Sequence, residues 1–171
     1  MNIDELRALP KSQIARATSG LSEADVDFLV QQLSKKDDAL RYNALLLLQA
    51  NSRLSPQTYA HWAVFEEKLA SDNSYQRSIG LMLIAENVRW DKEGKFGRTI
   101  GKYLACCMDE KFITARQAIQ GLVHIVEATD AYNERIRLFL SRLKLEKYKE
   151  NQQKLLKKDI SAIIQNLDEK M

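Results

Sequence analysis

The sequence predicts an all-α fold built from repeated pairs of helices. Six Gly and two Pro in 171 residues are too few for a chain rich in turns, and 40 Leu or Ala outnumber 23 Val, Ile or Thr. Leu and Ala favour helices, whereas β-branched residues favour strands. Apolar residues also recur three and four positions apart, which is the spacing of one helix face. The length is typical of one domain, so we expect a single domain over residues 1–171.

An internal repeat is the second observation. Three segments begin with an acidic residue, continue to an Arg and lead into a strongly apolar helix; the arginines are Arg41, Arg77 and Arg116, spaced 36 and 39 residues apart. A period of about 20 to 50 residues is typical of repeat proteins. Each apolar helix follows another amphipathic segment, so the repeating unit is a pair of helices.

A single pair of helices cannot bury its own apolar face, so several pairs must stack to share a core. The last pair lacks the Arg signature and is more charged, as expected for a terminal repeat with one solvated face. We predict N-terminal capping helices at 1–20 and helix pairs at 21–54, 55–90, 94–128 and 130–168.

Local signals indicate where these elements start. Pro10 interrupts the N-terminal stretch and divides it into short helices. Ser22 and Asp25 have the spacing of a capping box at the start of the first pair. Ser55 followed by Pro56 predicts a helix capped by Ser55, because Pro is favoured at the first helical position.

The residues around the repeated arginines share a pattern. An Asp precedes the second helix, an Arg stands near its start, and a small residue follows three positions later, as in Arg41 with Ala44 and Arg77 with Gly80. This pattern resembles that of the HEAT-like (armadillo-type) repeat family. The resemblance covers about residues 21–167 and implies a right-handed α–α superhelix, or solenoid, of about four helix pairs. It also implies a scaffold or adaptor role, although a minority of such proteins are DNA-glycosylase-like or act on Fe–S or chromophore-bearing partners.

The third unit departs from this pattern. The residue three positions after Arg116 is Ile119, and the small residue Ala118 comes one position early. The sequence therefore leaves two alignments of this unit with the other two, which differ by one residue.

We expect the acidic residues and arginines of the second helices to form a structural ladder. An acidic residue at a helix start favours the positive end of the helix dipole and can cap free N–H groups. The arginines would tie neighbouring repeats together through the acidic turns; the alternative is that one of them reaches a partner. The ladder comprises Asp38, Arg41, Asp72, Arg77, Asp109 and Arg116.

The sequence has few residues in patterns that suit catalysis. The chain has two histidines, His61 and His124, and no Gly-rich phosphate loop. Cys106 and Cys107 are adjacent, a spacing that suits neither a disulfide framework nor a zinc or redox pair. We expect a protein that is not an enzyme and that holds no metal or cofactor.

Polar positions on the second helices are better candidates for function, because the resemblance places these helices on the concave surface of the superhelix. Residues spaced three or four apart share one helix face. A Tyr and a Met among polar residues could anchor a peptide of a protein partner; the alternative is an ordinary solvated face. The candidate partner-binding residues are Tyr75, Ser78, Met82, Glu86, Gln117, Gln120, His124 and Glu127.

The C-terminal part of the chain offers an alternative function. From Arg135 to Met171 there are ten Lys or Arg and five Asp or Glu, and basic helices attract the phosphates of nucleic acids. The acidic residues that interrupt this run fit a solvated terminal repeat equally well. A remote third hypothesis is a DNA-glycosylase-like repair enzyme, for which Trp90 and Asp91 are the one aromatic and carboxylate pair.

We expect a cytoplasmic protein without a membrane span or a small-molecule substrate. The longest apolar run in the middle of the chain, Ala44–Leu48, is far shorter than the roughly 18 to 20 residues that cross a bilayer. Asp4 and Glu5 precede any apolar stretch, which is unlike a secretion signal.

Overall fold

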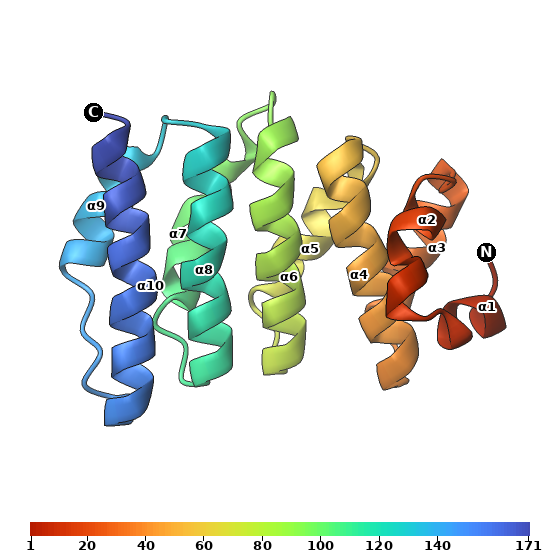
Figure 1. Ribbon diagram of the computed structural model, residues 1–171, viewed down its shortest axis with the longest axis horizontal. Coiled ribbons are helices and arrows are strands. Elements are labelled where there is room, and N and C mark those ends of the chain that lie inside the picture. Colours follow the sequence, from red (N-terminus) through yellow and green to blue (C-terminus); the bar gives the residue numbers. More distant parts are fainter.

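Two layers of helices make up the molecule. The computed structural model describes all 171 residues, and every regular element is a helix, which confirms the all-α prediction. One layer holds the second helix of each pair, α4 (Asp38–Leu54), α6 (Ser74–Asn87), α8 (Phe112–Ala128) and α10 (Glu150–Glu169), standing side by side in Figure 1. The layer behind it holds the first helices, α3 (Glu23–Gln32), α5 (Trp62–Lys68), α7 (Lys95–Cys106) and α9 (Asn133–Ser141).

Short elements complete the chain. Two helices, α1 (Ile3–Ala8) and α2 (Ile14–Thr18), pack against α4 at the N-terminal end of the row. Three 3-10 helices, η1 (Lys11–Gln13), η2 (Thr58–His61) and η3 (Val88–Trp90), join longer elements. The Asn43 amide on α4 donates to the backbone oxygens of Leu6, at 2.8 Å, and Leu9, at 3.2 Å. These bonds satisfy carbonyls at the end of α1, and the buried Leu6 side chain closes this end of the core.

Helix starts follow local hydrogen-bonding chemistry. Ser22 and Asp25 form the expected capping box at the start of α3. Asp37 caps α4 by accepting from the backbone N–H of Leu40 at 3.0 Å, and Asn73 caps α6 by accepting from Tyr75 at 2.9 Å. Short polar side chains are favoured at these positions because they replace the missing backbone acceptors.

The predicted helix start at Ser55 is wrong. Ser55 ends α4 in an extended conformation, and α5 begins only at Trp62. Between them, the backbone N–H of Tyr59 donates to the Pro56 oxygen and that of Ala60 to Gln57, so Pro56 opens a tighter 3-10 turn in place of an α-helix.

The core runs through both layers. Trp62, Phe96 and Tyr103 stack edge to face between α5 and α7, and the indole N–H of Trp62 donates to the Thr99 hydroxyl at 3.1 Å. The wholly buried Tyr103 hydroxyl reaches the backbone oxygen of Ala118 on α8 at 2.8 Å. None of the helices is long and apolar enough to span a membrane.

The helix starts resolve the register of the third unit. The seventh residue of three second helices is small: it is Ala44 in α4, Gly80 in α6 and Ala118 in α8. All three are buried. The small residue therefore has the same position in all three helices, whereas Arg116 stands one position later in α8 than Arg77 does in α6.

Gly80 permits the closest approach between the two layers. A Cβ atom at this position would lie 2.6 Å from the backbone oxygen of Phe65 and 3.0 Å from the Cβ of Lys68, both on α5. Because the nearest atom belongs to the backbone, relief requires α5 and α6 to separate.

We expect Gly80→Ala to lower the free energy of unfolding by about 1–3 kcal/mol, because overpacking outweighs the gain in helix propensity. Urea denaturation measures this change. Gly20→Ala is the matched control, since a Cβ at Gly20 meets no atom within 4 Å. Equal stability of the two variants would contradict the close-packing argument.

Candidate functional site

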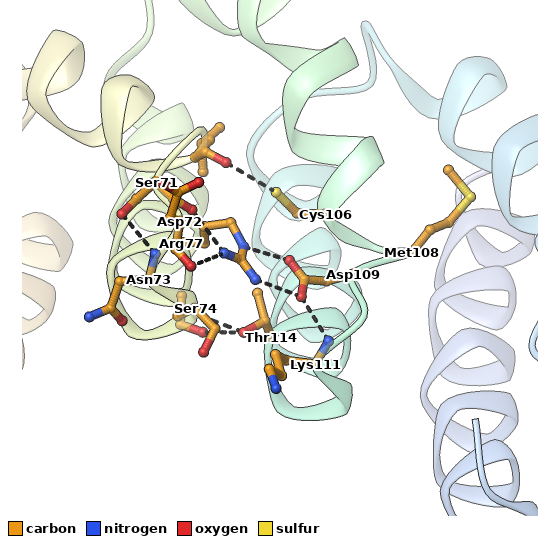
Figure 2. A network of polar contacts seen from close by, with 12 residues as sticks. Ser71, Asp72, Asn73, Ser74, Arg77, Cys106, Met108, Asp109, Lys111 and Thr114 are labelled. Carbon is orange, nitrogen blue, oxygen red and sulfur yellow. Dashed lines mark hydrogen bonds and ion pairs between the residues drawn. The ribbon is translucent and has the colours of Figure 1, made fainter. Parts of the chain in front are cut away.

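A partly buried ion pair joins α6 to the turn before α8. The Arg77 guanidinium donates from Nε to one carboxylate oxygen of Asp109 at 2.7 Å and from Nη2 to the other at 2.9 Å (Figure 2). Its Nη1 donates to the backbone oxygen of Ser71 at 2.8 Å. Burial by itself raises the pKa of Asp109, but the bonds from Arg77 and the Lys111 backbone hold the pKa below its ordinary value. This bidentate pair fixes the turn before α8 against the turn before α6.

The other predicted members of the ladder behave differently. Arg116 bridges to Asp159 in the body of α10 at 2.8 Å and does not reach an acidic turn. One residue later in a helix means a rotation of about 100°, which explains its different partner. Arg7, which the sequence argument missed, pairs with Asp37 at 3.1 Å at the N-terminal end.

The ladder prediction is wrong for Arg41 and Asp72. Arg41 donates to Asp38 on its own helix at 2.5 Å and to the Lys35 backbone oxygen, and it makes no ion pair with the turn before α6. Asp72 offers Arg77 only its backbone oxygen, at 3.2 Å. Asp109 stands three residues before the start of α8, and the residue three before the start of α6 is Ser71. Arg41 therefore meets no carboxylate in the next turn.

An apolar groove lies on the face formed by the second helices. We call it the tyrosine groove; it has a volume of about 640 Å³. Three large apolar side chains at its border are exposed: Tyr75 at 70%, Ile113 at 62% and Tyr42 at 44%. The groove is lined by Asp38, Ala39, Arg41, Tyr42, Leu45, Leu46, Gln49, Tyr75, Ser78, Ile79, Met82, Ile113 and Gln117.

The structure brings four of the eight candidate binding residues to this groove. Tyr75 and Met82 border it from α6, and Gln117 borders it from α8. The side-chain oxygen of Gln117 is buried and accepts no hydrogen bond. Ser78 also borders the groove, but it is buried and shares a 3.0 Å hydrogen bond with Thr114, so it joins α6 to α8 and is not an open contact.

Glu86 is not the open contact that its helix face predicted. Its carboxylate is 2% exposed and accepts from Arg53 at 2.6 Å and from Arg89 at 3.3 Å. The His124 ring nitrogen lies 3.7 Å away. The two arginines therefore compensate this buried charge and tie α4 to α6. Gln120 and Glu127 are exposed on α8 and do not line the groove.

Sequence reasoning missed Tyr42, Ile113, Arg53 and Arg89. Tyr42, Leu46 and Gln49 follow helical spacing, and Ile113 and Gln117 stand four residues apart, so a face search on every second helix would have found these groove residues. No local signal marks Arg53 as a partner of Glu86, because 33 residues separate them.

Trp90 and Asp91 make hydrogen bonds to the backbone of this chain. The Trp90 indole donates to the Ser52 backbone oxygen at 2.7 Å. Asp91 accepts from the backbone N–H groups of Lys95 and Phe96 at the start of α7. Burial raises the pKa of the Cys106 thiol to about 11. No three His, Cys, Asp or Glu side chains are grouped as metal ligands.

Some basic residues of the C-terminal helices form ion pairs, and others do not. Arg137 pairs with Asp168 at 2.7 Å, and Lys170 pairs with Asp130 at 3.3 Å. Lys154, Lys157 and Lys158 are exposed on α10 and form no ion pair.

No family model, curated protein or solved structure matches this chain.

We expect Asp109→Asn to lower the free energy of unfolding by about 2 kcal/mol at pH 7, because it removes the counter-charge that accepts two hydrogen bonds from Arg77. The pKa of Asp109 is lower in the folded protein than its value of 3.8 in the unfolded chain, so the carboxylate stabilises the fold at pH values above 3.8. This stabilisation is lost as the pH falls through the pKa of the folded protein. The difference from the wild type should therefore shrink below about pH 4. Urea denaturation at pH 7 and pH 3 measures both effects.

Asp168→Asn is the control, because its pair with Arg137 is exposed and should contribute at most about 1 kcal/mol. Equal losses in both variants, or a difference that does not depend on pH, would refute the role given to Arg77 and Asp109.

Proposed function

We propose that the chain is a non-enzymatic adaptor of the cytoplasm that holds a segment of a partner protein in the tyrosine groove. In this proposal the helix pairs are HEAT-like repeats, and their right-handed superhelix makes the second-helix face concave. The observation that carries the proposal is the exposure of Tyr75, Ile113 and Tyr42 around one apolar hollow.

Exposed apolar side chains around a hollow favour binding for two reasons. Covering them removes apolar surface from water, and aromatic side chains frequently supply most of the energy of an interface. The unpaired acceptor of Gln117 adds specificity, because a donor on the partner would satisfy a buried oxygen that has no partner within the chain.

The shape of the surface favours an amphipathic helix as the occupant. Tyr42, Leu46 and Gln49 also border an adjoining hollow of about 300 Å³ that extends along α4 to Arg53. From Tyr42 to Arg53 is 11 residues, which corresponds to roughly 16 Å of helix. About three turns of a partner helix would fit this length, with apolar residues over the groove and an acidic residue near Arg53, which is 55% exposed.

Capture from a cell lysate treated with nuclease tests the proposal, with bound proteins identified by mass spectrometry. The wild type should retain a defined protein, and Tyr75→Ala should retain at least about tenfold less of it, since a central aromatic anchor contributes about 2 kcal/mol or more. Leu138→Ala is the matched control, because Leu138 is 51% exposed on α9, away from the groove.

A protein captured equally by the wild type and Tyr75→Ala would overturn the groove as the site. The exposed Lys154, Lys157 and Lys158 provide the second candidate function, nucleic-acid binding. That function predicts loss of the bound material on nuclease treatment, a steep salt dependence, and no response to Tyr75→Ala.

A further inference from the structure

Two charged side chains belong to buried residues, and only one of them has a counter-charge. Glu86 is paired with arginines, as described above. Lys68 on α5 is 7% exposed, and its ammonium donates to the Ser34 hydroxyl at 2.9 Å and to the Gln76 side-chain oxygen at 2.5 Å. Both acceptors are neutral, and no carboxylate lies within ion-pair distance. Buried charges are ordinarily paired, because burial without a counter-charge is costly.

Lys68 lines a hollow of about 700 Å³ at the turns that precede α4 and α6. Three further cations, Lys35, Lys36 and Arg41, border the same hollow, and Glu67 is its single carboxylate. Arg41 is already paired with Asp38, whereas Lys35 and Lys36 form no ion pair. The hollow therefore has a clear excess of positive charge.

Hydrogen-bond donors are available beside this charge. An ammonium group has three donors, and Lys68 uses two of them within the protein. The Ser71 hydroxyl oxygen accepts from the Asn73 backbone, which leaves its own proton free to donate. Burial lowers the pKa of Lys68 despite the nearby Glu67, so an anion that restores charge balance would favour the ammonium form.

We propose that this hollow binds a small oxyanion of the phosphate type, with Lys68 as the buried donor and Lys35 and Lys36 as the entrance. A phosphate group accepts several hydrogen bonds at once and carries the charge that Lys68 lacks within the chain. The size of the hollow leaves room for the organic group of a phosphate ester. This proposal does not depend on the tyrosine groove or on its partner.

Titration calorimetry at constant ionic strength tests the site, with inorganic phosphate, pyrophosphate and adenosine monophosphate as separate probes. Binding of at least one probe is expected, and the comparison distinguishes free phosphate from an esterified one. Lys68→Met should weaken the Kd at least about tenfold, because it removes a charged hydrogen bond. Lys157→Met is the control, because it removes the same charge at an exposed position on α10, and it should leave the Kd unchanged.

Lys68 also ties Ser34 to Gln76, so the double variant Lys35→Met with Lys36→Met provides a second test at two exposed positions. It should retain the fold and weaken binding several-fold. Amide shifts of Lys35 and Ser71 in NMR spectra of the wild type should move on addition of the probe. Absence of binding, equal binding by Lys68→Met and Lys157→Met, or amide shifts confined to α10 would each overturn the proposal.

Discussion

The packing of α6 between its neighbours is the constraint on which the rest of the molecule depends. From Ser78 to Asn87, every residue except Met82 is buried, because α4 and α8 pack on the two sides of α6 and α5 packs behind it. Gly80 allows this enclosure by removing the side chain that would meet α5. Tyr75 lies on α6 before this buried stretch and Met82 lies within it, and these two are the α6 residues of the tyrosine groove that are not buried.

The two buried charged residues, Lys68 on α5 and Glu86 on α6, have different surroundings. Glu86 receives hydrogen bonds from Arg53 and Arg89, so its charge is compensated within the chain and its effect is to hold α4 and α6 together. Lys68 receives no such compensation. A charge satisfied internally gains little from a ligand, whereas an uncompensated one gains a counter-charge, and this difference separates a structural cluster from a binding site.

Local patterns predicted the helices because the signals for a helix lie within a few residues, as for Ser22 and Asp25. The functional face was predicted less well, because periodicity assigns a residue to a face without showing what covers that face. Ser78 has the spacing of a groove residue, yet it is covered by Thr114, 36 residues later in the chain. Glu86 has that spacing too, and a guanidinium 33 residues earlier covers it. Such contacts depend on how the helices pack against one another, which spacing within one helix does not specify.

One difference between the turns before α6 and α8 affects a residue that borders both proposed sites, Arg41. In the turn before α8, Asp109 neutralises Arg77, but the matching position before α6 is Ser71. Without a carboxylate there, Arg41 stays on its own helix, where its guanidinium lies 5.7 Å from the ring centre of Tyr75 and borders the tyrosine groove. Ser71 borders the hollow beside Lys68 without adding a charge to it, and Arg41 borders that hollow as well. An Asp at position 71 would stand to Arg41 as Asp109 stands to Arg77, and it would place a negative charge where the oxyanion is proposed to bind.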